Sequence, residues 1–384
     1  MGSLLASTAP VLRPAIALLC TLVIAACLTG CGDSGPTEPG PPPDGPSGVC
    51  RALNYFGANG GERIQNAIND TSCRTISIDD AGPDGSGVWH VTRGLTLRSS
   101  IVIENRGASA AVLESIGGGT HPILIVEGQS DVTIRGLRLQ GSLSSGIRID
   151  GSHRITVVQG TVSGSVRVGI RITGSPSSDI AISQMAFQDN GGVDVRTDTT
   201  DWNAYHSHVV VTNNSMTGTL YGVALQNCGS SPATACEVRN NTIRSSPRLD
   251  GSGVDLNRSH HAIVSGNTIS NGGHGMTVDD NQNAIISQNT IQGCLGYGIV
   301  LANGARPANK PWILSGNQIL DNTVSDNKLF GLASYRIPTD PDNRNELNVW
   351  RNNRISGNIA GGCSTNADQN TFSGNGPQAC SPQH

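Results

Sequence analysis

The chain alternates hydrophobic and polar residues in short runs that are separated by glycine and asparagine. The clearest stretch, residues 260–302, contains HHAIVSGNTISNGGHGMTVDD and QNAIISQNTIQGCLGYGIVLA, two copies of a unit of about 22 residues. Alternation with a period of two residues is typical of β-strands with one buried face, and glycine and asparagine favour tight turns. The pattern therefore predicts short strands joined by turns and repeated along a solenoid.

A glycine that opens the last alternating run of each unit marks the repeat. It recurs at Gly146, Gly169, Gly192, Gly222, Gly253, Gly275, Gly298 and Gly331, with a degenerate copy at Gly362. Successive markers lie 22 to 33 residues apart, so some turns carry extra loops. Three short strands per turn, each paired with its equivalent one turn later, make a parallel β-helix with strands about 4.8 Å apart. We predict an all-β parallel β-helix of about ten turns over residues 49–384, with the cap and first turns in 49–105.

Two further patterns fit a solenoid. Residues 62–69 (ERIQNAIN) place Ile64, Ala67 and Ile68 on one helical face, which predicts a short helix that caps the N-terminal end. Asparagines recur at one place in successive turns, where stacked amides can hydrogen-bond along the axis. This predicts a structural ladder, and not a set of sugar ligands, at Asn214, Asn241, Asn267, Asn289, Asn317 and Asn353.

The repeats resemble the right-handed parallel β-helix proteins of the pectate-lyase superfamily over about residues 49–376. The resemblance implies a right-handed helix and a groove on one sheet that holds an extended polysaccharide. Gly273-His274-Gly275 also resembles the Gly-His-Gly of polygalacturonase-type glycoside hydrolases. Those enzymes carry carboxylates where this chain has Gly251, Ser252, Leu220 and Tyr221, and the Asp-Pro-His-Asp signature of alginate epimerases is absent.

The N-terminal residues indicate export. Residues 15–28 form an apolar run of fourteen residues, too short to span a bilayer but typical of a signal-peptide core. The run leads into Leu28-Thr29-Gly30-Cys31, which resembles a bacterial lipobox. We expect residues 1–30 to be a lipoprotein signal peptide, Cys31 to be lipidated, and residues 31–48 to form a Pro/Gly-rich tether. The protein would then be exported and anchored by its lipid in the outer membrane or periplasm or at the cell surface.

The net charge limits the possible binding partners, and the cysteines predict disulfides. Without residues 1–30 the formal charge is 24 − 29 = −5, which argues against a nucleic-acid partner. We expect a monomer. Export favours disulfides, and proximity predicts the pairs Cys50–Cys73, Cys228–Cys236 and Cys363–Cys380, with Cys294 left buried and free. The cysteines and histidines lack zinc spacing, so no structural zinc is expected.

The strand after each marker glycine carries the candidate chemistry, because its two non-core positions point outward. The first outward column reads Arg148, Arg171, Asp194, Ala224, Asp255, Thr277, Val300 and Ala333. The second reads Asp150, Thr173, Arg196, Gln226, Asn257, Asp279, Ala302 and Tyr335. Extra residues at 197–208, 227–236, 303–312 and 336–346 follow this strand and those at 244–252 precede it, so loops should wall this face into a groove.

Acid–base chemistry on sugars needs carboxyl groups or an imidazole at a bound glycosidic bond. The candidate catalytic residues are His274, Asp255, Asp279 and Arg196, and the candidate substrate-binding residues are Asp194, Arg171, Tyr221, Asn257 and Tyr297. No metal site is assigned, although Ca²⁺ is a candidate cofactor for an enzyme that neutralises uronate carboxylates. One hypothesis is a polysaccharide lyase or glycoside hydrolase acting on an extended polysaccharide, with uronic-acid polymers among the candidate substrates. The other is a non-catalytic β-helix that binds glycan or serves as a spacer.

Overall fold

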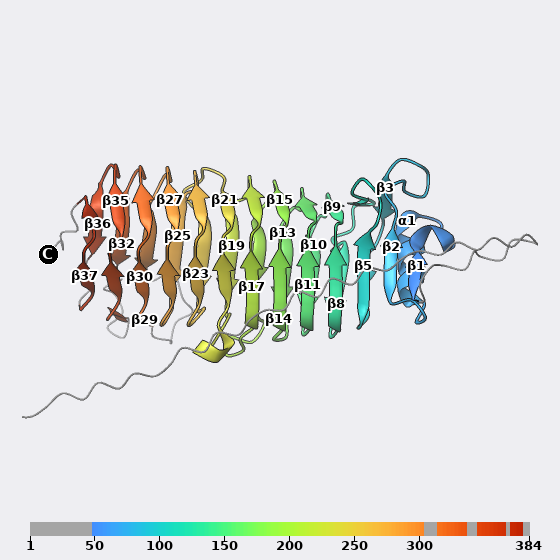
Figure 1. The fold of residues 1–384 in the computed structure, drawn as a ribbon, viewed down its shortest axis with the longest axis horizontal. Coiled ribbons are helices and arrows are strands. Elements are labelled where there is room, and N and C mark those ends of the chain that lie inside the picture. The colour runs from blue at the N-terminus through green and yellow to red at the C-terminus, as the bar shows by residue number, and fades with distance from the viewer. Residues whose placement is uncertain (1–47, 303–312, 336–343, 366–368, 379–384) are drawn as a thin grey trace, which may run out of the picture. The chain divides into compact units, whose positions relative to one another are not determined.

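The computed structural model describes residues 48–302, 313–335, 344–365 and 369–378. Within them the chain winds into a right-handed parallel β-helix of about 12 turns (Figure 1). The predicted all-β fold is confirmed, with about 12 turns where about ten were predicted. The expected signal peptide, lipidation site and nearly all of the tether lie outside the described residues. No helix in the described part is long and apolar enough to cross a membrane.

Three long parallel sheets form the walls of the solenoid. The 13-stranded sheet consists of β1 Val49–Arg51, β2 Thr75–Ile78, β5 Ile101–Asn105, β8 Ser130–Arg135, β11 His153–Val158, β14 Ser178–Ser183, β17 Ser207–Thr212, β20 Glu237–Arg239, β23 Ile263–Ser265, β26 Ile285–Ser287, β30 Gln318–Leu320, β34 Val349–Arg351 and β37 Thr371–Ser373. The 12-stranded sheet consists of β3 Val88–Val91, β6 Val112–Ser115, β9 Arg138–Gln140, β12 Thr161–Ser163, β15 Ala186–Gln188, β18 Ser215–Thr217, β21 Thr242–Arg244, β24 Thr268–Ser270, β27 Thr290–Gln292, β31 Thr323–Ser325, β35 Arg354–Ser356 and β38 Gly376–Pro377.

The third sheet has 11 strands and holds the residues predicted to act on a ligand. It consists of β4 Leu95–Thr96, β7 Leu124–Glu127, β10 Ser145–Asp150, β13 Val168–Thr173, β16 Val193–Thr197, β19 Tyr221–Gln226, β22 Ser252–Asn257, β25 His274–Asp279, β28 Ile299–Ala302, β32 Phe330–Tyr335 and β36 Gly361–Thr365. A separate pair, β29 Ile313–Ser315 and β33 Arg344–Glu346, lies outside the three sheets, and the short 3-10 helices span Ala52–Asn54 and Pro232–Thr234.

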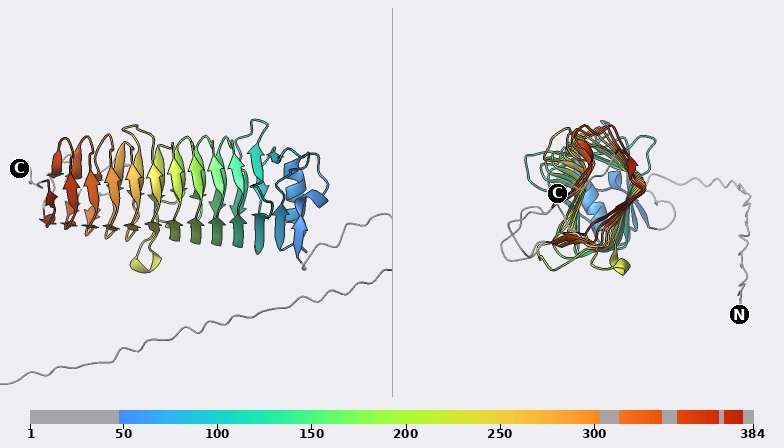
Figure 2. Two further views of the ribbon diagram at one scale, coloured as in Figure 1. Left: turned by 45° about the horizontal axis from the view of Figure 1, so that its top comes forward. Right: turned by 90° about the vertical axis from the view of Figure 1, so that its left-hand side faces the viewer.

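The core consists of inward side chains stacked one turn above another. In the 11-stranded sheet one fully enclosed column reads Ile147, Ile170, Val195, Val223, Val254, Met276, Ile299 and Leu332. Each fully buried aliphatic side chain of this size stabilises the fold by about 1.5–3 kcal/mol. The view along the axis shows the three sheets arranged around the interior of the solenoid (Figure 2).

The predicted N-terminal helix is present as α1, Gly60–Asn69, and its residues Ile64, Ala67 and Ile68 are buried. The Asn59 side chain caps it by accepting from the Glu62 N–H at 3.0 Å, and Glu62 accepts from the Ala58 N–H in return. The helix packs against β3 and β4 and lies at the N-terminal end of the solenoid, where it caps the first turns (Figure 1).

Asparagine ladders run along the corners, as predicted, but with one member misplaced. Asn214, Asn241, Asn267 and Asn289 are joined by amide–amide hydrogen bonds of 2.9–3.0 Å, and the next rung of that ladder is Asn322. Asn317 belongs instead to a second ladder with Asn348. The assignment of Asn317 was wrong because it precedes β30 of the 13-stranded sheet, whereas Asn289 and Asn322 precede β27 and β31 of the 12-stranded sheet.

Two of the three predicted disulfides, Cys50–Cys73 and Cys228–Cys236, are confirmed. Cys363 is disulfide-bonded, and its predicted partner Cys380 lies outside the described residues. Cys294 is free and buried, as predicted.

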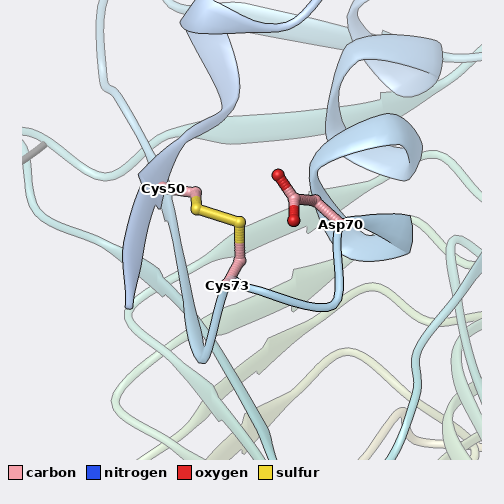
Figure 3. Close-up of side chains that lie close together, drawn as sticks. All are labelled: Cys50, Asp70 and Cys73. Atoms are coloured by element: carbon pink, nitrogen blue, oxygen red, sulfur yellow. A yellow bond between two sulfur atoms is a disulfide. The ribbon is translucent and has the colours of Figure 1, made fainter. Parts of the chain in front are cut away.

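The N-terminal disulfide lies beside the Asp70 carboxylate, and the three side chains form a compact group (Figure 3). Because the sulfur atoms of Cys50 and Cys73 are bonded to each other, they are not thiolate ligands. Asp70 accepts hydrogen bonds from Tyr55 Oη at 2.8 Å and Ser72 Oγ at 2.6 Å. We therefore interpret the group as a covalent staple of the cap.

Candidate functional site

The outward columns of the 11-stranded sheet follow the prediction except on β16. Val193 pairs with Val168, Val195 with Ile170, and Arg196 with Arg171. Asp194 therefore occupies the position of the marker glycine, and Gly192, which was used as the marker, lies two residues too early. The corrected first outward column reads Arg148, Arg171, Arg196, Ala224, Asp255, Thr277, Val300 and Ala333.

Asp194 is not a substrate ligand, because its side chain is fully buried at 0 % exposure. Asn190 Nδ2 donates to one carboxyl oxygen at 2.8 Å, and Thr219 Oγ1 donates to the other at 2.8 Å. Burial raises the pKa of Asp194 to about 8. The group is therefore a neutral acid of the interior at neutral pH, and its prediction as a substrate-binding residue was wrong.

Strands β19 to β32 carry a concave site of about 380 Å³, which we call the acidic depression. Its carboxyl groups belong to Asp250, Asp255 and Asp279, and its rings are those of His274, Tyr221, Tyr297 and Tyr335. The loop before β22 supplies Leu249 and Asp250 to the wall, as predicted for residues 244–252. The structure thus brings three of the four predicted catalytic residues, His274, Asp255 and Asp279, together in one depression.

Asp255 and Asp279 form an acidic pair on neighbouring strands. Asp255 pairs with Thr277 and Asn257 pairs with Asp279, so the two carboxyls lie one strand and two residues apart. Burial raises the pKa of Asp255, against the hydrogen bond from Thr277 Oγ1 and the charge of Arg196. Burial and the negative charges of Asp255 and Asp280 raise the pKa of Asp279 well above its usual range. The pair therefore retains a proton at a pH where isolated Asp side chains are ionised.

The His274 imidazole is held in one tautomer. The backbone N–H of Tyr297 donates to His274 Nδ1 at 3.1 Å, so in the neutral ring the proton lies on Nε2. Burial lowers the pKa of His274, which keeps the ring neutral. A Cβ at Gly296 would overlap the ring, so glycine is required beside it. His274 therefore offers an N–H donor to the depression and is poorly placed to act as a base.

Three tyrosines continue the aromatic lining. The Tyr297 ring stacks on His274 with centroids 5.4 Å apart and lies 5.6 Å from the Tyr335 ring. Burial and the hydrogen bond with Tyr335 raise the pKa of Tyr297 to about 12. Tyr221 donates its hydroxyl to the Asp250 carbonyl at 2.5 Å, and burial raises its pKa. Tyr221 and Tyr297 therefore remain protonated at neutral pH, and all three tyrosines can stack on or hydrogen-bond to a sugar.

Arg258 fixes the loop between β16 and β17 against the body. Its guanidinium lies 4.0 Å from the Trp202 ring centroid, donates to the Trp202 carbonyl, and donates to Tyr205 Oη at 2.8 Å. Its Nε lies 3.5 Å from Asp280 Oδ2, and both side chains are buried. The predicted loop at 197–208 is thus present and anchored. The predicted loop at 303–312 and most of the one at 336–346 lie outside the described residues.

The remaining candidates lie elsewhere on the same sheet. Arg171 and Arg196 line a neighbouring depression on β10 to β16, and Arg196 lies two strands from Asp255, roughly 10 Å away. Asn257 lies beside Asp279 in the next strand without lining the acidic depression. Thr277 and Tyr335 also line the acidic depression. The sequence placed both in the outward columns without naming them as site residues, and Asp250 was not named because it lies in the loop before β22.

The groups of the acidic depression that could bind a cation such as Ca²⁺ are the carboxyl oxygens of Asp250, Asp255 and Asp279. Binding there must displace the proton that the pair retains. In the described part of the chain, the one compact group of three side chains with metal-ligand chemistry is that of the Cys50–Cys73 disulfide.

Comparison with known proteins agrees with this fold. The family model for a right handed beta helix region matches residues 202–376. The chain contains a right-handed β-helix domain. Among curated proteins none matches significantly. The A-module of a mannuronan C-5 epimerase from Azotobacter vinelandii superposes with a TM-score of 0.58 at 16% identity, covering 84% of this chain and 100% of that one.

Two hydrolases are similar to this chain at the same level of fold. An exopolygalacturonase from Thermotoga maritima gives a TM-score of 0.64 at 10% identity and covers 86% of this chain and 92% of its own. The catalytic unit of an α-1,3-glucanase from Streptomyces thermodiastaticus gives 0.60 at 13% identity, covering 87% and 69%. At these identities the likeness shows the shared β-helix and assigns no activity.

Proposed function

We propose that the protein cleaves an extended polysaccharide by acid–base catalysis at Asp255 and Asp279, with hydrolysis as the reaction. The observation that carries the proposal is the half-buried carboxyl pair, whose pKa values are raised, in a depression lined by one imidazole and three phenols. The similar fold of a polygalacturonase and a glucanase supports a carbohydrate as the ligand.

A carboxyl pair that shares one proton offers both groups that hydrolysis needs. The protonated member can donate to the glycosidic oxygen while the ionised member takes a proton from the attacking water. The His274 Nε2–H and the tyrosine hydroxyls can hold the sugar in place by hydrogen bonds and stacking. The chain departs from the polygalacturonase pattern here, because its carboxyls lie within the strands, whereas that family places them just before the strands.

Elimination from a uronate fits the acidic depression less well. It needs a base at C5 and a positive group that neutralises the sugar carboxylate. The described residues of the depression include neither Lys nor Arg, and Tyr297, with a pKa of about 12, is protonated at neutral pH. Hydrolysis is therefore the reaction that the chain's own residues support best.

The test is an activity screen of the purified protein against pectate, alginate, chondroitin, hyaluronan and neutral glucans, with and without Ca²⁺. New reducing ends and the ultraviolet absorbance of unsaturated sugars are recorded together. We expect reducing ends without absorbance, and a loss of about 10²–10⁴-fold in Asp255→Asn and in Asp279→Asn. The exposed Asp321→Asn serves as the matched control and should keep full activity.

Other outcomes of the screen would replace this proposal. Absorbance would establish elimination. Glycan binding with neither signal would establish a non-catalytic glycan-binding β-helix. Activity that survives both Asp substitutions would place the chemistry elsewhere on the molecule.

We also propose that the protein is an exported monomer whose Cys31 carries a membrane-anchoring lipid after removal of residues 1–30, with residues 31–48 as the tether. The disulfides of the β-helix support export. Expression in a bacterial host with labelled palmitate should label the protein and place it in the membrane fraction. Cys31→Ser should remove both the label and the membrane association, and equal labelling of the two proteins would refute the anchor.

A further inference from the structure

Three arginines form a stack on the 11-stranded sheet next to the acidic depression. Arg148, Arg171 and Arg196 are direct register partners on β10, β13 and β16. Adjacent strands are roughly 4.8 Å apart, so each guanidinium has a like charge as its neighbour. Like charges directly across a strand pair destabilise a sheet. A merely solvated face has no need of three equal charges in register.

Arg167 adds a fourth positive charge. It lies just before β13, is exposed, and has neither a hydrogen bond nor an ion pair from its guanidinium to any described residue. Fewer carboxylates than guanidinium groups lie in contact with these four arginines. Arg148 pairs with Glu127 at 2.6 Å, while Arg171 and Arg196 share the single carboxylate of Asp198, at 3.1 and 2.8 Å. Four positive charges thus meet two negative ones.

Arg167, Arg171 and Arg196 line a depression of about 390 Å³, which we call the arginine depression and which also includes Val168 and Val193. Its apolar floor continues into the acidic depression. Val168, Val193 and Ala224 form a small cluster on the outer face, separate from the core, and Tyr221 packs against it. Tyr221 also lines the acidic depression. The two depressions are therefore neighbouring sections of one surface along the sheet.

We propose that the arginine depression binds anionic groups, carboxylates or sulfates, of the same polysaccharide whose glycosidic bond lies over Asp255 and Asp279. The proposal rests on the proposed function in taking a polysaccharide as ligand. Guanidinium groups bind carboxylates and sulfates through paired N–H donors, and Arg171 and Arg196 are already oriented by Asp198. The apolar strip at Ala224 and Tyr221 suits the non-polar face of a sugar ring between the two charged sections.

The geometry also orders the polymer along the sheet. Arg196 and Asp255 belong to one outward column, two strands apart, and Arg171 lies one strand further. The anionic groups that contact Arg171 and Arg196 thus lie roughly 10–15 Å from the cleaved bond. Anionic oligosaccharides must be long enough to span both sections, and shorter ones should bind no more tightly than neutral ones.

The experiment measures dissociation constants by calorimetry on Asp255→Asn protein, in which turnover is suppressed. The probes are long oligogalacturonates, their methyl esters, and sulfated dextran oligosaccharides, at low and at physiological ionic strength. Arg167→Gln and Arg171→Gln are added singly and together. Arg154→Gln, an equal charge change at an exposed site of the 13-stranded sheet, is the matched control.

We expect each substitution to weaken binding of an anionic probe about fivefold and the double substitution about 25-fold, the size for partly exposed charge contacts. Arg154→Gln should leave binding unchanged, and the methyl esters should bind all variants equally weakly. Loss confined to oligogalacturonates identifies carboxylate recognition, and loss confined to sulfated dextran identifies sulfate. The inference is overturned if the Asp255→Asn protein binds anionic probes equally well with and without the two arginine substitutions, or if it binds no anionic probe.

The two proposals can fail separately. Cleavage that depends on Asp255, together with binding that ignores Arg167 and Arg171, overturns this inference and leaves the proposed hydrolysis standing. If the protein cleaves none of the polymers but its binding of anionic probes depends on the arginines, the proposed hydrolysis is overturned and this inference stands.

Discussion

Replacing Asp194 with Asn should stabilise the protein relative to wild type, by an amount that grows as the pH rises. In the folded chain the pKa of Asp194 is about 8, against an ordinary value of 3.8. Below about pH 4 Asp194 is protonated in both the folded and the unfolded state, so its ionisation does not change the free energy of unfolding. Between about pH 4 and pH 8 the unfolded chain ionises while the folded chain stays neutral, and stability is lost as the pH rises.

The size of the effect follows from the shift. One pKa unit corresponds to about 1.4 kcal/mol, so folding loses about 1.4 kcal/mol per pH unit through this window. From 3.8 to 7 the loss is 3.2 units, or about 4 kcal/mol. Asp194→Asn keeps the size of the side chain and can accept from Asn190, while its amide can donate to Thr219, but it cannot ionise.

Chemical denaturation of wild type and Asp194→Asn at several pH values between about 5 and 8 tests this reasoning. The stability difference should widen by about 1.4 kcal/mol per pH unit in favour of the variant. Asp321→Asn, an equal charge change at an exposed position, is the matched control. A difference that does not change with pH would mean that Asp194 is ionised in the folded protein, and would refute the assignment of a neutral buried acid.

Three further predictions concern the site itself. Arg258→Ala should destabilise the protein by about 3 kcal/mol, because the buried ion pair with Asp280 is lost. It should also speed amide exchange in residues 198–206, because Arg258 is the main anchor of that loop, and unchanged exchange would contradict this. Gly296→Ala should displace the His274 ring and lower activity without loss of stability beyond about 1–2 kcal/mol, as read from kinetics and melting together. Arg196→Gln should raise the pKa of Asp255, since the arginine charge stabilises the carboxylate, and so shift the acidic limb of the pH–rate profile to higher pH; an unmoved limb would exclude the coupling.

The fold was readable from the sequence because each turn repeats the same local pattern. Alternating residues and turn-forming Asn and Gly determine the strands, and their period determines the stacking. The register was readable only where the marker glycine was intact. On β16 the marker position holds Asp194, so Gly192 was mistaken for it and Arg196 was assigned to the wrong column. Local pattern alone could not correct this, since the shift becomes visible only when Val195 and Arg196 pair with Ile170 and Arg171.

The same limit applies to the chemistry of the site. The sequence named His274 as a candidate, but its tautomer depends on the Tyr297 N–H of the next turn, which no local motif encodes. The raised pKa values of Asp255 and Asp279 likewise arise from burial and, for Asp279, also from the negative charges of Asp255 and Asp280. Such properties belong to pairs of turns, whereas the sequence pattern describes one turn at a time.

A β-helix separates the requirements of folding from those of function. Inward positions must remain apolar in every turn, because each one packs against the turns before and after it. Outward positions such as 196, 224, 255 and 277 contact only their direct neighbours, so their charge can change from strand to strand at little cost to the core. In this chain that freedom places positive, apolar and acidic sections in order along one sheet. Because each section is built from two or three neighbouring strands, the order of turns in the chain becomes the order in which successive parts of a bound polymer meet them.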